Sequence, residues 1–286
     1  MDIYRNINEL RSSVNAWKKQ NLRIGFVPTM GFLHTGHLAL IDAIKPKCDK
    51  LIVSIFVNPK QFGPGEDIER YPRNFERDQQ SIEAHHADAI FYPAVEEMYP
   101  DDYYTYVQVE ELGAVLCGRS RPTHFRGVTT VVTKLFMATK CDIAVFGQKD
   151  YQQALIIQQM IKDLNFDIEV MICPTLREED GLAMSSRNSY LSEEERQRAV
   201  CLYRALKRAE DLYANGEKHA ALLREEMKNE VLTVPEIRID YLEVVDALTL
   251  QSIDIIERKT LLAGAIWLGK ARLIDNIVID VEPIDA

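Results

Sequence analysis

The chain of 286 residues is long enough for one large domain or two of ordinary size, and we expect two. Hydrophobic residues make up 47% and charged residues 27%, which is the composition of a globular protein with a substantial core. This composition excludes a disordered chain, a collagen-like chain and a disulfide-dense mini-domain. The net charge of −10 argues against a nucleic-acid partner, because phosphate backbones are bound by clustered Lys and Arg.

The chain shows no sign of a membrane or secretory destination. Its most continuous apolar run, Leu51–Val57, is far shorter than the roughly 18 residues of a membrane helix. The first residues lack a basic region followed by an apolar stretch, so we expect no secretory signal. The scattered cysteines never form a C-x-x-C pair, which predicts reduced thiols in a cytoplasmic protein, with neither disulfides nor a zinc site. They are Cys48, Cys117, Cys141, Cys173 and Cys201.

In the first half of the chain, short β-rich runs alternate with amphipathic segments. The predicted strands are Arg23–Val27, Leu51–Val57, Ala89–Tyr92, Ile143–Phe146 and Ile168–Ile172. The predicted helices are Leu38–Ile44, Asn74–Ala84, Val128–Ala138 and Gln152–Asp163. Near-continuous apolar strands separated by helices indicate a parallel sheet covered on both faces. We therefore expect a Rossmann-like, doubly wound α/β fold.

The pattern changes after Asn188. Ser192 followed by three acidic residues is a helix start, because a Ser cap and negative charge both favour the N-terminal end of a helix. One long helix, Glu193–Ala214, and a second, Ala220–Val231, are predicted to follow. Three strands come last, at Ile237–Val245, Thr260–Trp267 and Ala271–Val281. We expect two domains, residues 1–186 and a smaller α+β domain at 187–286.

The densest group of functional residue types runs from Val27 to Leu38. A buried strand ends, a glycine-containing loop follows, and a helix begins near Gly36. Neither a Walker A loop nor a dinucleotide fingerprint fits, because His37 and Leu38 stand where Lys and Ser or Thr belong. A helix N-terminus nevertheless suits an anion. His34 and His37, three residues apart, share one face of the helix start.

Three interpretations compete for these histidines. They can cap the loop structurally, bind a metal, or contact a phosphate. A metal site is the weakest, since neither Cys nor a third His lies at ligand spacing. The sequence H-x-G-H at the first helix of an α/β sheet favours nucleotide binding.

Three further polar clusters accompany this loop. Asn58–Phe62 and Gly147–Gln153 each follow a predicted strand, and ligands of open parallel sheets bind outside the carboxyl ends of the strands. We therefore expect a shared site, in which Lys149 supplies positive charge for phosphate and Gln61 and Gln153 supply hydrogen bonds. The third cluster, residues 181–188, offers two hydroxyls and a guanidinium as a phosphate clamp, or is an ordinary turn between domains.

Ordered motifs along nearly the whole chain resemble the pantoate–β-alanine ligase family. They are P-T-M-G-x-L-H-x-G-H (28–37), S-I-F-V-N-P-x-Q-F (54–62), R-Y-P-R (70–73), R-P-T-H-F-R-G-V (121–128), F-G-Q-K-D-Y-Q-Q (146–153), D-G-L-A-M-S-S-R-N (180–188) and W-L-G-x-A-R-L-I-D-N (267–276). Gln148 and Met184 stand where the family often has Glu and Leu. The resemblance implies a nucleotidyltransferase domain, a C-terminal lid domain and a homodimer. It also implies ATP with Mg²⁺, and (R)-pantoate and β-alanine as substrates.

The resemblance also assigns residues. His37, His34 and Lys149 would be catalytic, Gln61 and Gln153 would hold pantoate, and no residue is assigned to a metal. The ATP contacts would be Met30, Gly31, Phe32, Leu33, His34, Thr35, Gly36 and His37, then Gly147, Gln148, Lys149 and Asp150, then Leu176, and finally Met184, Ser185, Ser186 and Arg187. A helical face formed by Val128, Val131 and Val132 would be either an apolar wall for pantoate or core packing.

The implied chemistry is activation of a carboxylate as an acyl adenylate, which an amine then attacks. Three alternatives remain. Another H-x-G-H adenylyltransferase would share the motif but would not require Gln61 and Gln153. An aminoacyl-tRNA synthetase also pairs H-x-G-H with M-S-S-R, although the acidic charge disfavours it. A non-catalytic nucleotide sensor would not need polar residues at every cluster.

Overall fold

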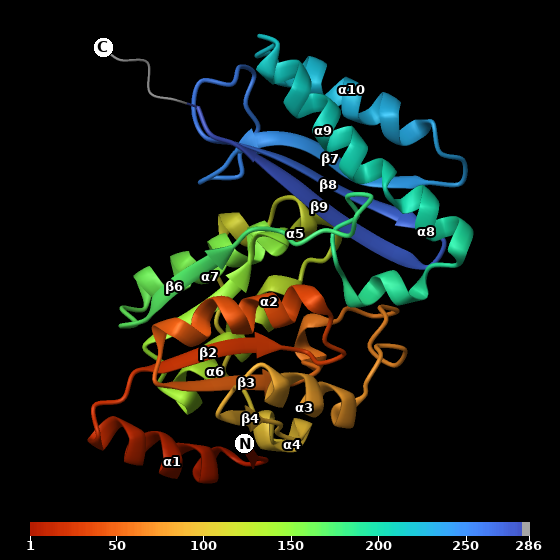
Figure 1. Cartoon of the computed structure of the whole chain (residues 1–286). Coiled ribbons are helices and arrows are strands. Elements are labelled where there is room, and N and C mark those ends of the chain that lie inside the picture. Colours follow the sequence, from red (N-terminus) through yellow and green to blue (C-terminus); the bar gives the residue numbers. More distant parts are fainter. Residues whose placement is uncertain (282–286) are drawn as a thin grey trace. The chain divides into compact units, whose positions relative to one another are not determined.

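The computed structural model describes residues 1–281, and the chain forms two compact units (Figure 1). The first comprises residues 1–113, 121–148 and 153–174. The second comprises residues 114–120, 149–152 and those from 175 onward. The predicted boundary between residues 186 and 187 therefore lies inside the second unit.

The first unit is built on a parallel sheet, as predicted. Within residues 1–281 its six strands run in the order β1-β4-β3-β2-β5-β6, all parallel. They are β1 (Asp2–Tyr4), β2 (Ile24–Thr29), β3 (Lys50–Ile55), β4 (Ala89–Phe91), β5 (Ile143–Gly147) and β6 (Glu169–Cys173). The strand order reverses between β2 and β5, so this is the switch point at which such sheets bind ligands.

Helices cover both faces of this sheet, which confirms the doubly wound prediction. Alternate side chains of β2 and β3 enter opposite cores, with Phe26 and Ile52 in one and Val27 and Val53 in the other. The first core includes α1 (Ile7–Lys19), α6 (His124–Thr139) and α7 (Tyr151–Asp163). The second core includes α2 (Thr35–Ile44) and α3 (Phe75–Ala84).

The central strand β2 is paired unequally on its two sides. It pairs with β3 at six successive positions, from Ile24 to Thr29. It pairs with β5 only at Gly25 and Phe26, although β5 continues to Gly147. The two strands therefore stop pairing before Pro28, on the side of the sheet edge where the H-x-G-H loop begins.

The second unit has an antiparallel sheet with helices packed against it, which confirms the predicted α+β character. Its strands β7 (Arg238–Asp246), β8 (Thr260–Leu268) and β9 (Ala271–Ile279) lie in that order. Three helices also contribute to its core, namely α8 (Glu193–Ala199), α9 (Cys201–Ala214) and α10 (Ala220–Leu232). Ser192 caps α8 together with Glu195, as predicted.

The single helix predicted from Glu193 to Ala214 is wrong in one respect, because Val200 interrupts it. Val200 has a ψ of −17°, and its N–H bonds to the carbonyl of Arg198, closer along the chain than in an α-helix. Four further elements are not among those predicted from the sequence, namely β1, α1, α4 (Val95–Met98) and α5 (Cys117–Ser120). Short 3₁₀ turns occupy Lys45–Lys47 (η1), Pro59–Gln61 (η2), Glu111–Gly113 (η3), Gln148–Asp150 (η4) and Ser186–Tyr190 (η5). None of the helices in residues 1–281 combines the length and apolar character needed to cross a bilayer.

Candidate active site

The loop that follows β2 is held by a buried carboxylate from α3. The Oδ2 atom of Asp78 accepts the N–H of Phe32 at 2.7 Å, and Oδ1 accepts the N–H of Leu33 at 2.8 Å. Gly31 and Phe32 have φ values of +84° and +50°, a left-handed turn that aims these N–H groups at the carboxylate. Burial raises the pKa of Asp78, and the two N–H donors oppose that rise. The backbone of the H-x-G-H loop is therefore fixed from outside the motif.

The two imidazoles of the motif cap the start of α2 reciprocally. The Nδ1 atom of His34 accepts the N–H of Gly36 at 3.1 Å, and that of His37 accepts the N–H of His34 at 3.4 Å. Their ring centroids lie 4.0 Å apart, so they share one face as the spacing predicts. An Nδ1 that accepts a hydrogen bond carries no proton, so each neutral ring carries its proton on Nε2. The helix start thus supplies two imidazole N–H donors.

Gln61 is the centre of a second group of polar contacts in the first unit. Its Oε1 accepts from Nδ2 of Asn58 at 3.0 Å, and its Nε2 lies 3.0 Å from Sδ of Met30. Asn58 is buried and also accepts from the Tyr99 hydroxyl at 2.9 Å, while donating to the Gly127 carbonyl at 3.0 Å. The structure therefore brings together Met30 and Gln61, which belong to different clusters in the sequence.

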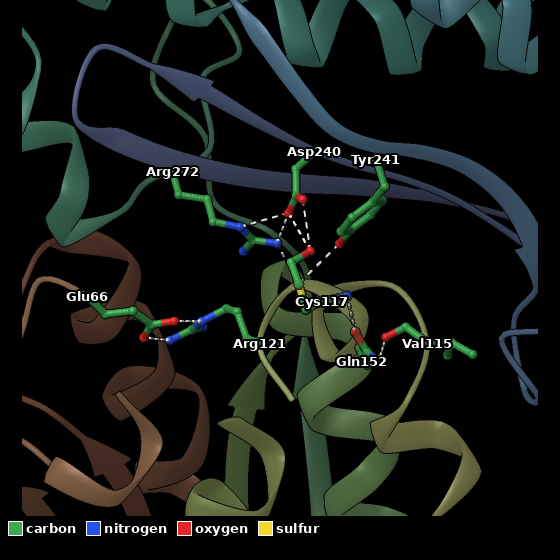
Figure 2. Close-up of polar contacts among 9 residues, drawn as sticks. Glu66, Val115, Cys117, Arg121, Gln152, Asp240, Tyr241 and Arg272 are labelled. Carbon is green, nitrogen blue, oxygen red and sulfur yellow. Dashed lines mark hydrogen bonds and ion pairs between the residues drawn. The ribbon is translucent and has the colours of Figure 1, made fainter. Parts of the chain in front are cut away.

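The backbone of Gln61 is held by the R-P-T-H-F-R-G-V motif. Its carbonyl lies 2.9 Å from Nδ1 of His124 and accepts from Arg121 at 3.3 Å. Arg121 also forms a bidentate pair with Glu66, at 2.7 and 2.6 Å (Figure 2). At Gly127 a Cβ would lie 2.1 Å from the Lys60 carbonyl, so only glycine lets α6 approach η2 this closely.

Lys149 lies in the second unit, on the turn that precedes α7. Its carbonyl accepts from Nδ2 of Asn276 at 2.9 Å, and its Nζ is 4.0 Å from Asp150. The same segment is held by Tyr151, which donates to the Ala247 carbonyl at 3.0 Å. It is also held by Gln152, which bonds the backbone of Val115 and Cys117 (Figure 2).

The segment Met184–Arg187 follows a small hairpin in the second unit. Met184 donates its N–H to the Leu176 carbonyl at 3.0 Å, and Ser185 caps η5 by accepting the N–H of Arg187 at 3.2 Å. Ser185 and Lys149 line one pocket of this unit. Its other lining residues are Leu182, Ala183, Asn188, Ala199, Leu202, Tyr203, Leu273, Ile274 and Asp275.

The other predicted site residues are placed as follows. Gly147 and Gln148 end β5 and begin η4, and Gln153 is half-buried in the first turn of α7. Leu176 is exposed in the second unit. The apolar face of α6, formed by Val128, Val131 and Val132, is buried in the core that also contains Phe56.

Four residues that hold this machinery were not assigned to it from the sequence. Asp78 gave no local signal, because its partners lie 45 and 46 residues earlier in the chain. Asn58 belongs to a predicted polar cluster, and Arg121 and His124 belong to a motif. The sequence therefore singled out these residues but did not indicate that they hold Gln61.

A parallel α/β sheet whose switch-point loop begins a helix with H-x-G-H defines a nucleotide-binding α/β protein. The family model described as pantoate-beta-alanine ligase matches residues 2–278, and the chain belongs to this family. The resemblance drawn from the motifs is thereby confirmed. The chain is a ligase that joins pantoate and β-alanine. A different adenylyltransferase, a tRNA synthetase and a nucleotide sensor do not account for this family match.

Curated relatives that match over nearly the whole chain support the same family assignment. The pantothenate synthetase of Moorella thermoacetica is 54% identical, and the match covers 99% of this chain and 100% of that protein. The pantothenate synthetase of Thermotoga petrophila is 53% identical, with 98% and 100% covered.

Solved structures give the same result. The crystal structure of pantothenate synthetase (pantoate-β-alanine) from Thermus thermophilus matches with a TM-score of 0.93 and 45% identity, covering 97% of this chain and 99% of that one. The pantoate-β-alanine ligase from Francisella tularensis, complexed with β-γ ATP and β-alanine, matches with a TM-score of 0.80 and 34% identity, covering 97% of each chain.

Proposed function

We propose that this enzyme makes pantothenate in two steps. A carboxylate oxygen of (R)-pantoate attacks the α-phosphorus of ATP, which forms pantoyl adenylate and releases pyrophosphate. The amine of β-alanine then attacks the activated carbonyl, which forms pantothenate and releases AMP. The family assignment and the Francisella tularensis complex with β-γ ATP and β-alanine support this proposal.

The observation that carries the proposal is the reciprocal cap of His34 and His37. Because both Nδ1 atoms are occupied by backbone N–H groups, the two Nε2–H groups are donors held by the helix start. Adenylation builds negative charge on the α-phosphate and on the departing pyrophosphate. Donors fixed in advance stabilise such charge without reorganising during the reaction. In this scheme His37 and His34 are the catalytic imidazoles.

Further ATP contacts are proposed for the turn that holds Lys149 and for the segment Met184–Arg187. Lys149 supplies a positive charge, and Ser185, Ser186 and Arg187 supply hydroxyl, backbone and guanidinium donors. Two of these residues, Lys149 and Ser185, line one pocket of the second unit. No Ser or Cys nucleophile is required, since ATP itself activates the carboxylate.

Gln61 and Gln153 are proposed to hold pantoate, with Gln61 also near β-alanine. The side chain of Gln61 is oriented by Asn58, and its backbone by Arg121 and His124. A glutamine whose backbone and side-chain amide are both held in place loses little conformational freedom when it binds a substrate.

Mg²⁺ is proposed to enter with ATP, since phosphate oxygens are ligands that this ion prefers. The bound ion would offset charge on the phosphates.

Further properties follow from the resemblance and stay predictions. They are a homodimer, a lid formed by residues 187–286, and a cytoplasmic location. The five cysteines lie within the described residues, where none is paired with another. Light scattering of the purified protein tests the dimer, and hydrogen exchange with and without ATP tests the lid.

The order of chemistry is tested by isotope exchange between pyrophosphate and ATP. Exchange should require pantoate and proceed without β-alanine. It should stop when pantoate is omitted, even with β-alanine present. An exchange that strictly needs β-alanine would remove the acyl adenylate from the mechanism.

A further inference from the structure

The C-terminal motif W-L-G-x-A-R-L-I-D-N contributes no residue to the mechanism above, yet it ends in two buried polar side chains. Asp275 and Asn276 are each 4% exposed and adjacent on β9. A buried carboxylate and a buried amide are costly unless they are well bonded. The Nδ2 atom of Asn276 bonds the carbonyl of Lys149, which is assigned to ATP. Asp275 bonds Arg177, in the hairpin that precedes the assigned segment Met184–Arg187.

Asn276 fixes the backbone from which the Lys149 side chain extends. Its Nδ2 donates to the Lys149 carbonyl at 2.9 Å, 127 residues away in the chain. Lys149 lies in a single 3₁₀ turn, which is too short to hold its own carbonyls in a regular ladder. This bond therefore helps to fix the backbone of the turn, together with the bonds of Tyr151 and Gln152.

Asp275 fixes the hairpin that leads into Met184–Arg187. Its carboxylate receives Arg177 in a bidentate pair, with Nη2 at 3.0 Å. Arg177 also donates to the Gly181 carbonyl at 3.1 Å, and its guanidinium lies 4.1 Å above the Tyr203 ring. The guanidinium thus joins the base of the hairpin, at residue 177, to its turn, at residue 181.

The charges explain why an arginine is needed here. Asp275 and Lys149 line the same pocket, so an uncompensated Asp275 would attract the Lys149 ammonium and compete with phosphate. Burial raises the pKa of Asp275, and Arg177 opposes that rise more strongly than Lys149 does. The pairing with Arg177 leaves the charge of Lys149 for a ligand.

We propose that Asp275 and Asn276 are positioning residues that hold Lys149 and Met184–Arg187 in one fixed arrangement for the phosphates of ATP. This inference rests on the ATP contacts proposed above. It assigns to the last motif of the chain a role in the adenylation step, exerted through other residues.

The test compares Asn276→Ala and Asp275→Asn with a matched control. Asp240→Asn breaks a carboxylate–arginine pair of the same sheet, between Asp240 and Arg272 (Figure 2). The other side-chain bonds of this pair go to Ser120 and Cys117, outside both ATP segments. For each variant, pyrophosphate–ATP exchange with pantoate gives KM for ATP and kcat. A chase of pre-formed adenylate with β-alanine gives the rate of amide formation. Thermal unfolding reports the stability of each variant.

We expect kcat/KM for ATP in exchange to fall roughly 10- to 100-fold in both test variants, the scale of a misplaced catalytic group. Amide formation should keep its wild-type rate, because pyrophosphate has already left. Asp240→Asn should lose stability and keep its ATP kinetics. An equal loss in exchange for Asp240→Asn would show a merely structural role. Asp275→Glu keeps a carboxylate for Arg177, so its exchange should be faster than that of Asp275→Asn.

A double-mutant cycle with Lys149→Ala separates this inference from the proposed site. If Asn276 acts through Lys149, the double variant should be no slower than Lys149→Ala alone. Additive losses would overturn the role of Asn276. Wild-type exchange in Lys149→Ala would instead overturn the ATP assignment itself. If Asn276→Ala does not fold, Asn276→Ser is tested in its place. Wild-type ATP kinetics in either folded variant would refute the inference.

Discussion

Replacing Asp78 should loosen the H-x-G-H loop without touching any residue of the motif. The carboxylate is 1% exposed and accepts the N–H groups of Phe32 and Leu33. Asp78→Ala leaves both donors without their acceptor, and Asp78→Asn keeps one acceptor oxygen while turning an NH₂ group toward the other donor.

The magnitude follows from these two bonds. A buried N–H that loses its partner costs about 1–3 kcal/mol, so Asp78→Asn should lower the free energy of unfolding by about that amount and Asp78→Ala by more. The raised pKa of Asp78 shows that burial disfavours its charged form, and a neutral amide escapes that penalty. The asparagine variant should therefore be the milder of the two.

Urea unfolding measures the stability change, and pyrophosphate–ATP exchange measures the effect on adenylation. We expect exchange to slow by about 10-fold or more in Asp78→Asn, because a loop shifted by an ångström misplaces the imidazoles. Glu76→Gln is the control, since it removes an exposed carboxylate in the first turn of the same helix. Wild-type stability and exchange in Asp78→Asn would refute the reasoning.

Three other substitutions test separate parts of the site. His37→Ala should keep the fold and reduce exchange by about 10²–10³, the usual cost of one fixed donor, and wild-type exchange would reject its role. Gly127→Ala should destabilise the protein by about 1–3 kcal/mol or more and weaken pantoate binding, since its Cβ would meet the Lys60 carbonyl at 2.1 Å, as calorimetry with pantoate would show. Burial alone would raise the pKa of Glu66, but Arg121 lowers it below its ordinary 4.5. This pair therefore stabilises the fold above that pH and is lost as pH falls through the lowered pKa, so acid unfolding curves of wild type should be steeper than those of Glu66→Gln.

Short-range sequence patterns were sufficient to predict features that depend on residues close together in the chain. The H-x-G-H loop was predictable because a strand end, a glycine and a helix start each have short-range signatures. Gly31 does adopt the left-handed conformation that glycine favours. The Ser192 cap and the strands other than β1 follow from the same kind of pattern.

Other features depend on partners that no local pattern names. The three-residue edge strand β1 is too short to show a period, and Val200 interrupts a helix without a glycine or proline signal. The inclusion of residues 149–152 in the second unit depends on contacts such as that of Asn276 with Lys149, far apart in the chain. The sequence shows the residue types of the site, and tertiary contacts decide which residues support it.

The position of Pro28 has a consequence for how the ligand edge of the sheet stays open. The Thr29 carbonyl faces β3, where it accepts the N–H of Phe56, so the preceding Pro28 faces β5. Proline has no N–H, so the ladder between β2 and β5 ends at Phe26. A residue with an N–H at this position would add a rung worth about 0.5–1.5 kcal/mol and draw the strands together. The end of β2 thus stays paired with β3 and unpaired with β5 because one donor is missing.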